Sequence, residues 1–302
     1  MIAKKMFEMQ NVIVGLGEIL WDMFPSGKVI GGAPANFAYH AHELGESSVV
    51  LSCVGNDELG REIISVLENN DMPTEFLYID KNHPTGFVSA KINKEGKPSY
   101  LIQERVAWDY IPTSKLLREL AFKSAAVCFG TVAQRSRLSR MAIQTFVGLM
   151  EQDSIRVFDI NLRQNFYSQD VIETSLNLAN VLKLNVDELS VVKKLFRLNG
   201  DEKNILNELS SKFSLNLIAL TRGRGGSILF TEGKTYNHEG YRINLEDTVG
   251  AGDAFVAALV IGLLKGYEFE DLHNKANRVA SYICSKHGAT PSLTNEIRKL
   301  FK

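Results

Sequence analysis

The longest apolar run of the chain, residues 254–264, follows directly on a glycine-rich loop, and this junction limits what the chain can fold into. The run consists of good helix formers, and Gly250, Ala251 and Gly252 lie just before it, so the sequence predicts a buried helix that begins at a tight loop. The run is well short of the roughly 20 residues that span a bilayer. The predicted helix therefore belongs in a protein core.

The start of this predicted helix also offers a chemical site. Gly250, Ala251 and Gly252 carry almost no side chain, so their backbone NH groups can approach a ligand, and the helix dipole favours an anion there. Asp253 lies in the first turn of the same helix. A carboxylate at this place is useful if it accepts a proton from a hydroxyl that attacks a phosphoryl group held by the NH groups. The alternative is a buried helix behind a glycine turn.

Composition excludes several functional classes. The 302 residues include 34 Lys+Arg and 35 Asp+Glu, so the net charge favours neither nucleic acid nor an anionic membrane as a partner. Cys53, Cys128 and Cys284 lie in apolar contexts without CxxC spacing, which argues against zinc and disulfide frameworks. The N-terminal residues do not resemble a signal peptide. We therefore expect a cytoplasmic protein that acts on a small molecule.

Short apolar runs alternate with helical segments along most of the chain, which is typical of a parallel sheet covered by helices. Strands are expected at residues 11–17, 49–54, 125–129, 156–160, 181–184 and 215–220, with a hairpin at 227–230 and 234–236. Helices are expected at residues 33–45, 58–70, 136–151, 170–179, 187–196, 202–213, 251–265 and 271–286. The sequence predicts one α/β domain, residues 1–302, built as a doubly wound three-layer α/β/α sandwich with a mostly parallel sheet.

The pattern changes between residues 72 and 110. Strands with no helix between them are expected at residues 75–79, 86–92 and 100–103. A hairpin connection is expected at residues 93–97. This predicts a small antiparallel β lid inserted into the domain. Such an insertion covers a site or a partner subunit, or it is only an edge extension of the sheet. If it covers a partner subunit, the protein is a homodimer that associates through the lid.

Familiar nucleotide and hydrolase motifs are missing from the chain. No segment matches the Walker pattern GxxxxGK[ST], and no complete GxGxxG follows a strand and opens a helix. HExxH and GxSxG are absent as well. A P-loop kinase, a dinucleotide oxidoreductase, a metalloprotease and an α/β-hydrolase are therefore disfavoured.

Two separate stretches resemble the two signatures of the ribokinase-like (PfkB) carbohydrate kinases. These are residues 31–36, GGAPAN, and residues 247–253, DTVGAGD. Their order, their separation and the total length also match, so the resemblance covers essentially the whole chain. With residues 159–163, DINLR, the chain looks most like the fructokinase branch.

The resemblance implies roles for individual residues. Asp253 matches the catalytic base of the family, and residues 250–252 match its anion hole. The positions that match sugar contacts are Asp22, Gly32 and Asn36, and Arg163 resembles an arginine that approaches sugar or phosphate. Each role has an alternative. Asp22 would then be an ordinary loop residue, Asn36 a helix asparagine whose hydrogen bonds are satisfied within the protein, and Arg163 a member of a surface ion pair.

On the nucleotide side the resemblance implies a second set of residues. Asn185 and Glu188 resemble the Asn-x-x-Glu motif that helps place magnesium and phosphate oxygens through water, although the same spacing is also a helix capping box. Thr221, Gly223 and Gly226 resemble the ATP-side loop.

Two further implications concern the end of the chain. Asn277 is expected to line the adenine pocket or to be a surface helix asparagine. Asp247, the carbonyl of Val249 and Ser292 lie where many members of the family hold a monovalent cation, and a set of oxygen ligands suits K⁺.

The sequence thus indicates an ATP-dependent sugar kinase that converts fructose to fructose 6-phosphate, with Mg²⁺ bridging the ATP phosphates. Kinases acting on 2-keto-3-deoxygluconate, ribose or a nucleoside are the nearest alternatives. A non-catalytic sugar-binding protein with the same fold is a more distant one.

Overall fold

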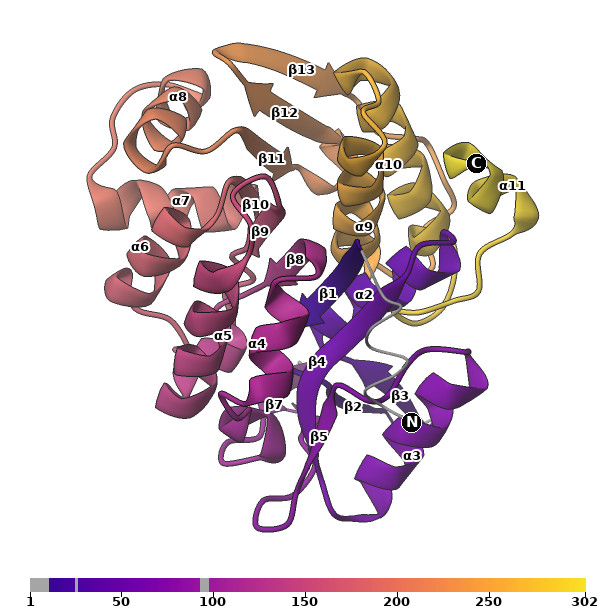
Figure 1. The fold of residues 1–302 in the computed structure, drawn as a ribbon. Helices are drawn as coiled ribbons and strands as arrows, with labels where there is room; N and C mark the ends of the chain where they lie inside the picture. Colours follow the sequence, from indigo (N-terminus) through magenta and orange to yellow (C-terminus); the bar gives the residue numbers. More distant parts are fainter. Residues whose placement is uncertain (1–10, 25–26, 93–97) are drawn as a thin grey trace.

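The computed structural model describes residues 11–24, 27–92 and 98–302, and within them nine strands form the main sheet (Figure 1). These strands are β1 Val12–Leu16, β4 Ser48–Gly55, β5 Leu77–Asp80, β8 Ser124–Phe129, β9 Ile155–Asp159, β10 Val181–Asn185, β11 Leu217–Thr221, β12 Ser227–Thr231 and β13 Lys234–His238. Their order across the sheet is β13-β12-β11-β10-β9-β8-β1-β4-β5. Neighbours from β5 to β11 run parallel, and β12 and β13 are antiparallel additions at one edge.

Helices follow most of the strands. The α-helices are α2 Ala33–Glu43, α3 Glu58–Asn69, α4 Lys115–Ala121, α5 Arg137–Leu149, α6 Gln169–Leu178, α7 Val186–Phe196, α8 Glu202–Phe213, α9 Ala251–Leu264, α10 Phe269–Cys284 and α11 Asn295–Arg298. The 3₁₀ turns are η1 Ala107–Tyr110, η2 Val132–Arg135, η3 Gly223–Gly225 and η4 Lys299–Phe301. Helices α4 and α11 are short and were not predicted.

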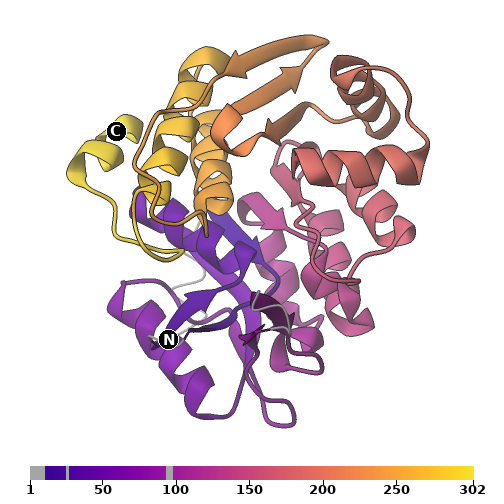
Figure 2. The ribbon, with the colours of Figure 1, turned by 180° about the vertical axis from the view of Figure 1, so that it is seen from behind.

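Side chains of one strand alternate between two cores. Val12, Val14 and Leu16 of β1 pack with buried residues of α4 to α8, whereas Ile13 packs with those of α2, α9 and α10. Figures 1 and 2 show the same division, with α9 and α10 on one side of the sheet and α5 to α8 on the other. The predicted three-layer α/β/α sandwich with a mostly parallel sheet is therefore confirmed.

A second sheet covers part of the carboxyl edge of the main sheet. In the described residues it has four strands in the order β3-β2-β6-β7, which are β2 Leu20–Phe24, β3 Gly27–Gly31, β6 Phe87–Ile92 and β7 Pro98–Ile102. The pairs β2–β3 and β6–β7 are antiparallel, and β2–β6 is parallel. The small sheet predicted from the sequence is present, and its expected hairpin connection at residues 93–97 lies outside the described residues.

Two details of that prediction are wrong. Residues 20–24 form β2, a strand that was not among those predicted. Leu20 and Trp21 are both buried while Asp22 and Met23 are half-buried, which hides the alternation expected of a strand. The strand expected at residues 75–79 is β5, which joins the edge of the main sheet parallel to β4 and does not belong to the lid. The lid therefore combines β2 and β3 with β6 and β7.

The apolar helix α9 lies in the core, as its sequence predicts. Its residues from Ala254 to Ile261 are at most 2% exposed, and it packs between α2 and α10. None of the helices in the described part of the chain has the length and hydropathy needed to cross a bilayer. The start of α9 lies near the carboxyl end of β11, because Ala251 and Gly252 line the same cavity as Thr221, the last residue of that strand.

Candidate active site

Asp253 and Asn36, one from each sequence signature, are in direct contact. Nδ2 of Asn36 on α2 donates a hydrogen bond of 2.8 Å to Oδ2 of Asp253 in the first turn of α9. Burial raises the pKa of Asp253, and the hydrogen bond from Asn36 and the charges of Lys183 and Arg163 act in the opposite direction. Oδ1 of Asn36 is buried and has no partner among the described residues, so it can accept a hydrogen bond from a ligand.

The start of α9 has no side-chain cap. Gly250 is the N-cap residue with a φ of 77°, a left-handed conformation that suits glycine. The amide of Ala251 donates to the carbonyl of Thr248 at 3.4 Å, whereas those of Gly252 and Asp253 have no acceptor among the described residues. Free amides at a helix start favour an anion, as the sequence predicted for this loop.

The lid brings Asp22 to the same place. Asp22 lies on β2, its carboxylate covers Gly31 of the paired strand β3, and burial raises its pKa to about 6. The charge of Asp22 also raises the pKa of Asp253, so the two carboxylates lie within electrostatic reach of each other. Gly32 is the N-cap of α2, and a Cβ there would overlap the carbonyl oxygen of Glu18. Its small size is thus required by the approach of two chain segments.

Glu18 is a buried acid directly after β1 that the sequence interpretation overlooked. The residue is 3% exposed, and its Oε2 has no hydrogen-bond partner among the described residues. Burial raises its pKa to about 7, its own backbone amide lowers it, and the charge of Asp253 raises it further. The position after the first buried strand was the available signal, because carboxyl ends of parallel strands face ligand crevices.

A buried ion pair lies beneath the start of α9. Nζ of Lys183 on β10 contacts Oδ1 and Oδ2 of Asp159 at 3.0 and 3.1 Å, and the two side chains are 10% and 4% exposed. Nζ also lies 3.2 Å from the place that a Cβ on Gly252 would occupy. The pair was not predicted, and its ammonium group adds positive charge below the free amides. Arg163 is exposed, but its charge lowers the pKa values of Asp253 and Glu18, so it lies near them.

Asn185 and Glu188 form the capping box that was one of the two interpretations of their spacing. Oδ1 of Asn185 accepts from the amide of Glu188 at 2.9 Å, and Oε2 of Glu188 accepts from the amide of Asn185 at 2.8 Å. Oε1 of Glu188 accepts from the amide of Leu162 at 3.1 Å. Burial raises the pKa of Glu188, and the charge of Lys183 lowers it.

A cavity of about 800 Å³ adjoins the start of α9 on the side of β11 to β13. Its lining includes the predicted residues Thr221, Gly223, Gly226, Ala251, Gly252 and Asn277. The side chain of Asn277 is held inside the protein, because Oδ1 accepts from Ser227 Oγ and Nδ2 donates to the carbonyl of His273. The segment 240–245 and Phe255 also line this cavity and were not predicted.

A hydrogen bond joins the two loops that carry the three residues predicted to hold a monovalent cation. Asp247 accepts hydrogen bonds from the amides of Thr248, Val249 and Gly288, which ties it to the loop containing Ser292. The carbonyl of Ser292 accepts from the hydroxyl of Tyr282. Among the described residues, no cluster of three or more His, Cys, Asp or Glu side chains is arranged to hold a metal ion.

The model of the pfkB family carbohydrate kinases matches residues 25–296 of this chain. The chain belongs to this family. It is therefore a sugar kinase, and the predicted resemblance is confirmed.

Named relatives agree with this assignment. The sugar kinase is 29% identical over 298 residues to an uncharacterized sugar kinase, PH1459 of Pyrococcus horikoshii, with 92% of each chain covered. It is 27% identical over 310 residues to fructokinase-2 of Zea mays, covering 94% of this chain and 91% of the relative. The structure of the Pyrococcus protein in complex with ATP superimposes with a TM-score of 0.80 at 27% identity, covering 96% of this chain and 99% of the other.

Proposed function

We propose that this sugar kinase transfers the γ-phosphoryl group of ATP to a hydroxyl of fructose and releases fructose 6-phosphate and ADP. The observation that carries the proposal is the position of Asp253. Its carboxylate accepts a hydrogen bond from Asn36 and lies within electrostatic reach of Asp22 on the lid, and the adjoining residues Ala251 and Gly252 line the 800 Å³ cavity. We infer from these contacts that Asp253 is a base between a site for a phosphate and a site for a hydroxyl.

In this mechanism the sugar oxygen forms a bond to the γ-phosphorus, the bond from that phosphorus to the oxygen of ADP breaks, and Asp253 accepts the hydroxyl proton. The amides of residues 250–252 stabilise the charge on the transferred group. Asn36 orients the carboxylate, which matters more than basicity because the proton can leave late in a loose transition state. The buried ammonium of Lys183 favours the anion.

The 800 Å³ cavity is the proposed ATP site, with Thr221, Gly223, Gly226 and Asn277 on its walls. The ATP complex of the Pyrococcus relative supports this. Mg²⁺, when bound with ATP, would neutralise the phosphate charge. Both carboxylate oxygens of Glu188 already accept hydrogen bonds from backbone amides. Glu188 and its hydrogen-bond partner Asn185 are therefore suited to contact the ion through a water molecule and not to bind it directly.

A monovalent cation is proposed next to the start of α9. The carboxylate of Asp247, the carbonyl of Val249 and Ser292 supply only oxygen, which suits K⁺. The hydrogen bond between Asp247 and the amide of Gly288 holds the two contributing loops together. The cation would stabilise this arrangement.

The acceptor is proposed to contact Asp22, Gly32, Asn36 and Arg163, and the choice of fructose is supported by the fructokinase relatives. ADP release measured with fructose, ribose, 2-keto-3-deoxygluconate and a nucleoside tests the function. Sugar-stimulated release that needs Mg²⁺ and increases with K⁺ is the expected result. A rate that no sugar increases would contradict the proposal.

A homodimer through the lid is proposed as well. In the described residues β3 and β7 are the outer strands of the lid sheet, and Phe24 and Leu101 on this sheet are 38% and 43% exposed. An open strand edge with exposed apolar side chains favours pairing with a second copy. Light scattering should show that the wild type is a dimer and that Leu101→Lys is a monomer. A monomeric wild type would exclude the homodimer.

A further inference from the structure

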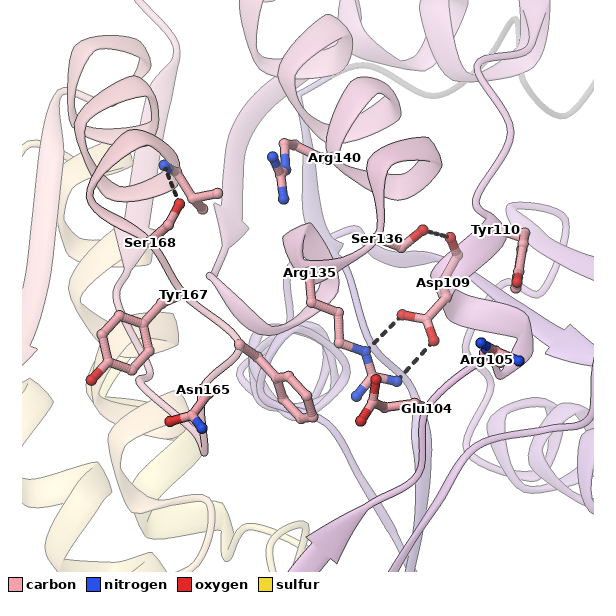
Figure 3. Close-up of a pocket in the computed structure, with 12 residues that line it drawn as sticks. Glu104, Arg105, Asp109, Tyr110, Arg135, Ser136, Arg140, Asn165, Tyr167 and Ser168 are labelled. Atoms are coloured by element: carbon pink, nitrogen blue, oxygen red, sulfur yellow. Dashed lines mark hydrogen bonds and ion pairs between the residues drawn. The ribbon is translucent and has the colours of Figure 1, made fainter.

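Arg135 and His40 are buried basic side chains that each leave one nitrogen without a hydrogen-bond partner among the described residues. Arg135 is held by a bidentate ion pair, in which its Nε and Nη2 donate to the carboxylate of Asp109 at 2.8 Å (Figure 3). The ring of His40 makes a single hydrogen bond within the described part of the chain, at 2.9 Å between Nε2 and the carbonyl oxygen of Ala289. Burying a polar group is costly unless it is hydrogen-bonded. The contact with Ala289 is therefore the interaction that a histidine gains at this place.

The hydrogen bond between His40 and Ala289 has one possible direction. His40 is 0% exposed, and burial lowers its pKa to about 4, so the ring is neutral at neutral pH. A neutral imidazole carries one proton, and a carbonyl oxygen can only accept, so the proton lies on Nε2. The ring therefore donates from α2 to the loop that follows α10.

The backbone of Ala289 also contacts the start of α9. A Cβ added to Gly250 would overlap the carbonyl oxygen and the Cα of Ala289, so these two backbone segments lie directly against each other. Ala289 is 1% exposed, and the amide of the preceding residue, Gly288, donates to Asp247 at 3.2 Å. The backbone of Ala289 is thus packed between the ring of His40 and Gly250.

Asn36 and His40 lie four residues apart on α2, so their side chains project from the same face of the helix. Asn36 donates to the carboxylate of Asp253, and His40 donates to the backbone that lies against Gly250. Helix α2 therefore holds the start of α9 at two points. Because His40 is fully buried and does not line the ATP cavity, it reaches this site through the backbone of Ala289.

We propose that His40 is a positioning residue for phosphoryl transfer, which holds Gly250 in place through the carbonyl of Ala289. The inference rests on the proposed function of the amides at the start of α9. Gly250 is the N-cap residue of this helix, so a shift of its backbone moves the free amides of Gly252 and Asp253. Such donors stabilise the transferred group only from fixed positions, and a displacement of about 1 Å can lower a rate about 10²-fold.

Three substitutions at His40 test the hydrogen bond. His40→Gln keeps an NH donor near the place of Nε2, His40→Asn carries its amide nearer to the place of Nδ1, and His40→Leu has no donor. With the best sugar acceptor, kcat should fall about tenfold or more in His40→Leu and His40→Asn, while the KM values for sugar and ATP change less than about threefold. His40→Gln should keep kcat within about threefold of the wild type. Full kcat in His40→Leu and His40→Asn, with only a lower Tm, would overturn the inference and leave the kinase function standing.

A double-mutant cycle tests whether His40 acts through Ala289 on Gly250. The substitutions His40→Leu and Gly250→Ala then disturb the same contact, so their effects should not multiply. The kcat of the double variant should lie within about threefold of the lower single variant. Losses of kcat that multiply would show that the two residues act independently, which would overturn the inference.

His42→Leu is the matched control, because His42 is a half-buried histidine two residues further along α2. It should leave kcat unchanged, and a loss equal to that of His40→Leu would overturn the inference. If His40→Leu unfolds early, His40→Asn takes its place in the cycle.

Thermal unfolding separates this inference from the proposed function. If no sugar stimulates ADP release, the kinase proposal fails, and the Tm values alone decide whether His40 holds Gly250. The loss of Tm caused by Gly250→Ala should be at least about 2 °C smaller in the His40→Leu background, because Ala289 can then withdraw from the added Cβ. Equal losses of Tm in the two backgrounds would overturn the inference.

Discussion

Asn36 and Asp253, which are 217 positions apart in the sequence, are joined by a hydrogen bond of 2.8 Å between Nδ2 and Oδ2. This contact connects the start of α2, behind the lid strand β3, to the start of α9, beside the ATP cavity. The two sequence signatures are therefore parts of one site. The hydrogen bond also fixes which oxygen of Asp253 remains free for an incoming hydroxyl.

Asp253→Asn should abolish proton acceptance while it keeps the shape of the site. We expect kcat to fall about 10²–10⁴-fold, with the affinities for ATP and sugar changed only a few-fold. Steady-state kinetics and calorimetry measure the two effects. Asp187→Asn, an exposed acid in the first turn of α7, is the matched control for loss of charge at a helix start. Near-normal turnover in Asp253→Asn would remove the proposed base.

Asn36→Ala should change the pH dependence of the reaction. The hydrogen bond from Asn36 lowers the pKa of Asp253, so its loss raises that pKa. Because the reaction needs ionised Asp253, the acidic limb of kcat/KM should move to higher pH, and kcat should fall about tenfold as the carboxylate loses its orientation. A pH profile of wild type and variant measures this. An unmoved acidic limb would mean that Asn36 serves only the sugar.

The fold could be predicted because each strand of the parallel sheet is a short apolar run and each helix has its own pattern. The lid was harder, since the pairing of β2 and the membership of β5 depend on neighbours that are distant in sequence. Asp253 and Gly250 could be found because the loop and the apolar helix are adjacent in the chain. Glu18 had one signal, its position after the first buried strand, and this was overlooked. Lys183 could not be found, because it is one polar residue within a strand until folding brings it beside Gly252.

Lys183→Met should destabilise the protein, because it leaves Asp159 buried without its cation. Breaking a buried pair in this way costs about 3–5 kcal/mol. The double variant Lys183→Met/Asp159→Leu removes both charges and should recover most of the free energy of unfolding, but not the activity, if the ammonium serves the phosphate. Urea unfolding and kcat of the three proteins measure the two effects. Recovery of both stability and turnover in the double variant would make the pair purely structural.

Glu18→Gln should alter how stability depends on pH. The folded protein holds the pKa of Glu18 at about 7, above its ordinary value of 4.5, so the contribution of its protonated form to stability is present below pH 4.5 and is lost as the pH rises through 7. The variant has no such loss. Its free energy of unfolding relative to wild type should therefore increase between pH 5 and pH 8, by up to about 3 kcal/mol. Chemical denaturation at both pH values measures this, and parallel curves would show that Glu18 does not titrate there.

Gly250→Ala should be more harmful than an alanine at another left-handed glycine. Gly250 has a φ of 77°, and a Cβ there would overlap the backbone of Ala289. That backbone cannot withdraw easily, because the carbonyl of Ala289 accepts a hydrogen bond of 2.9 Å from Nε2 of buried His40, whose pKa is lowered to about 4 by burial so that the ring stays neutral. Gly266 has a φ of 67° with nothing within 4 Å of the added Cβ. The variant Gly266→Ala therefore measures only the free-energy cost of a left-handed backbone conformation at an alanine.

We expect Gly266→Ala to cost about 1–2 kcal/mol of unfolding free energy and to leave kcat unchanged. Gly250→Ala should cost about 1–3 kcal/mol more, for the overlap, and should lower kcat because the amides at the start of α9 are displaced. Thermal unfolding and steady-state kinetics of both variants measure the difference. Equal losses of stability with full activity in both would show that the loop at Gly250 moves away from Ala289 at no cost, and the fixed arrangement of amides proposed for phosphoryl transfer would then have no support.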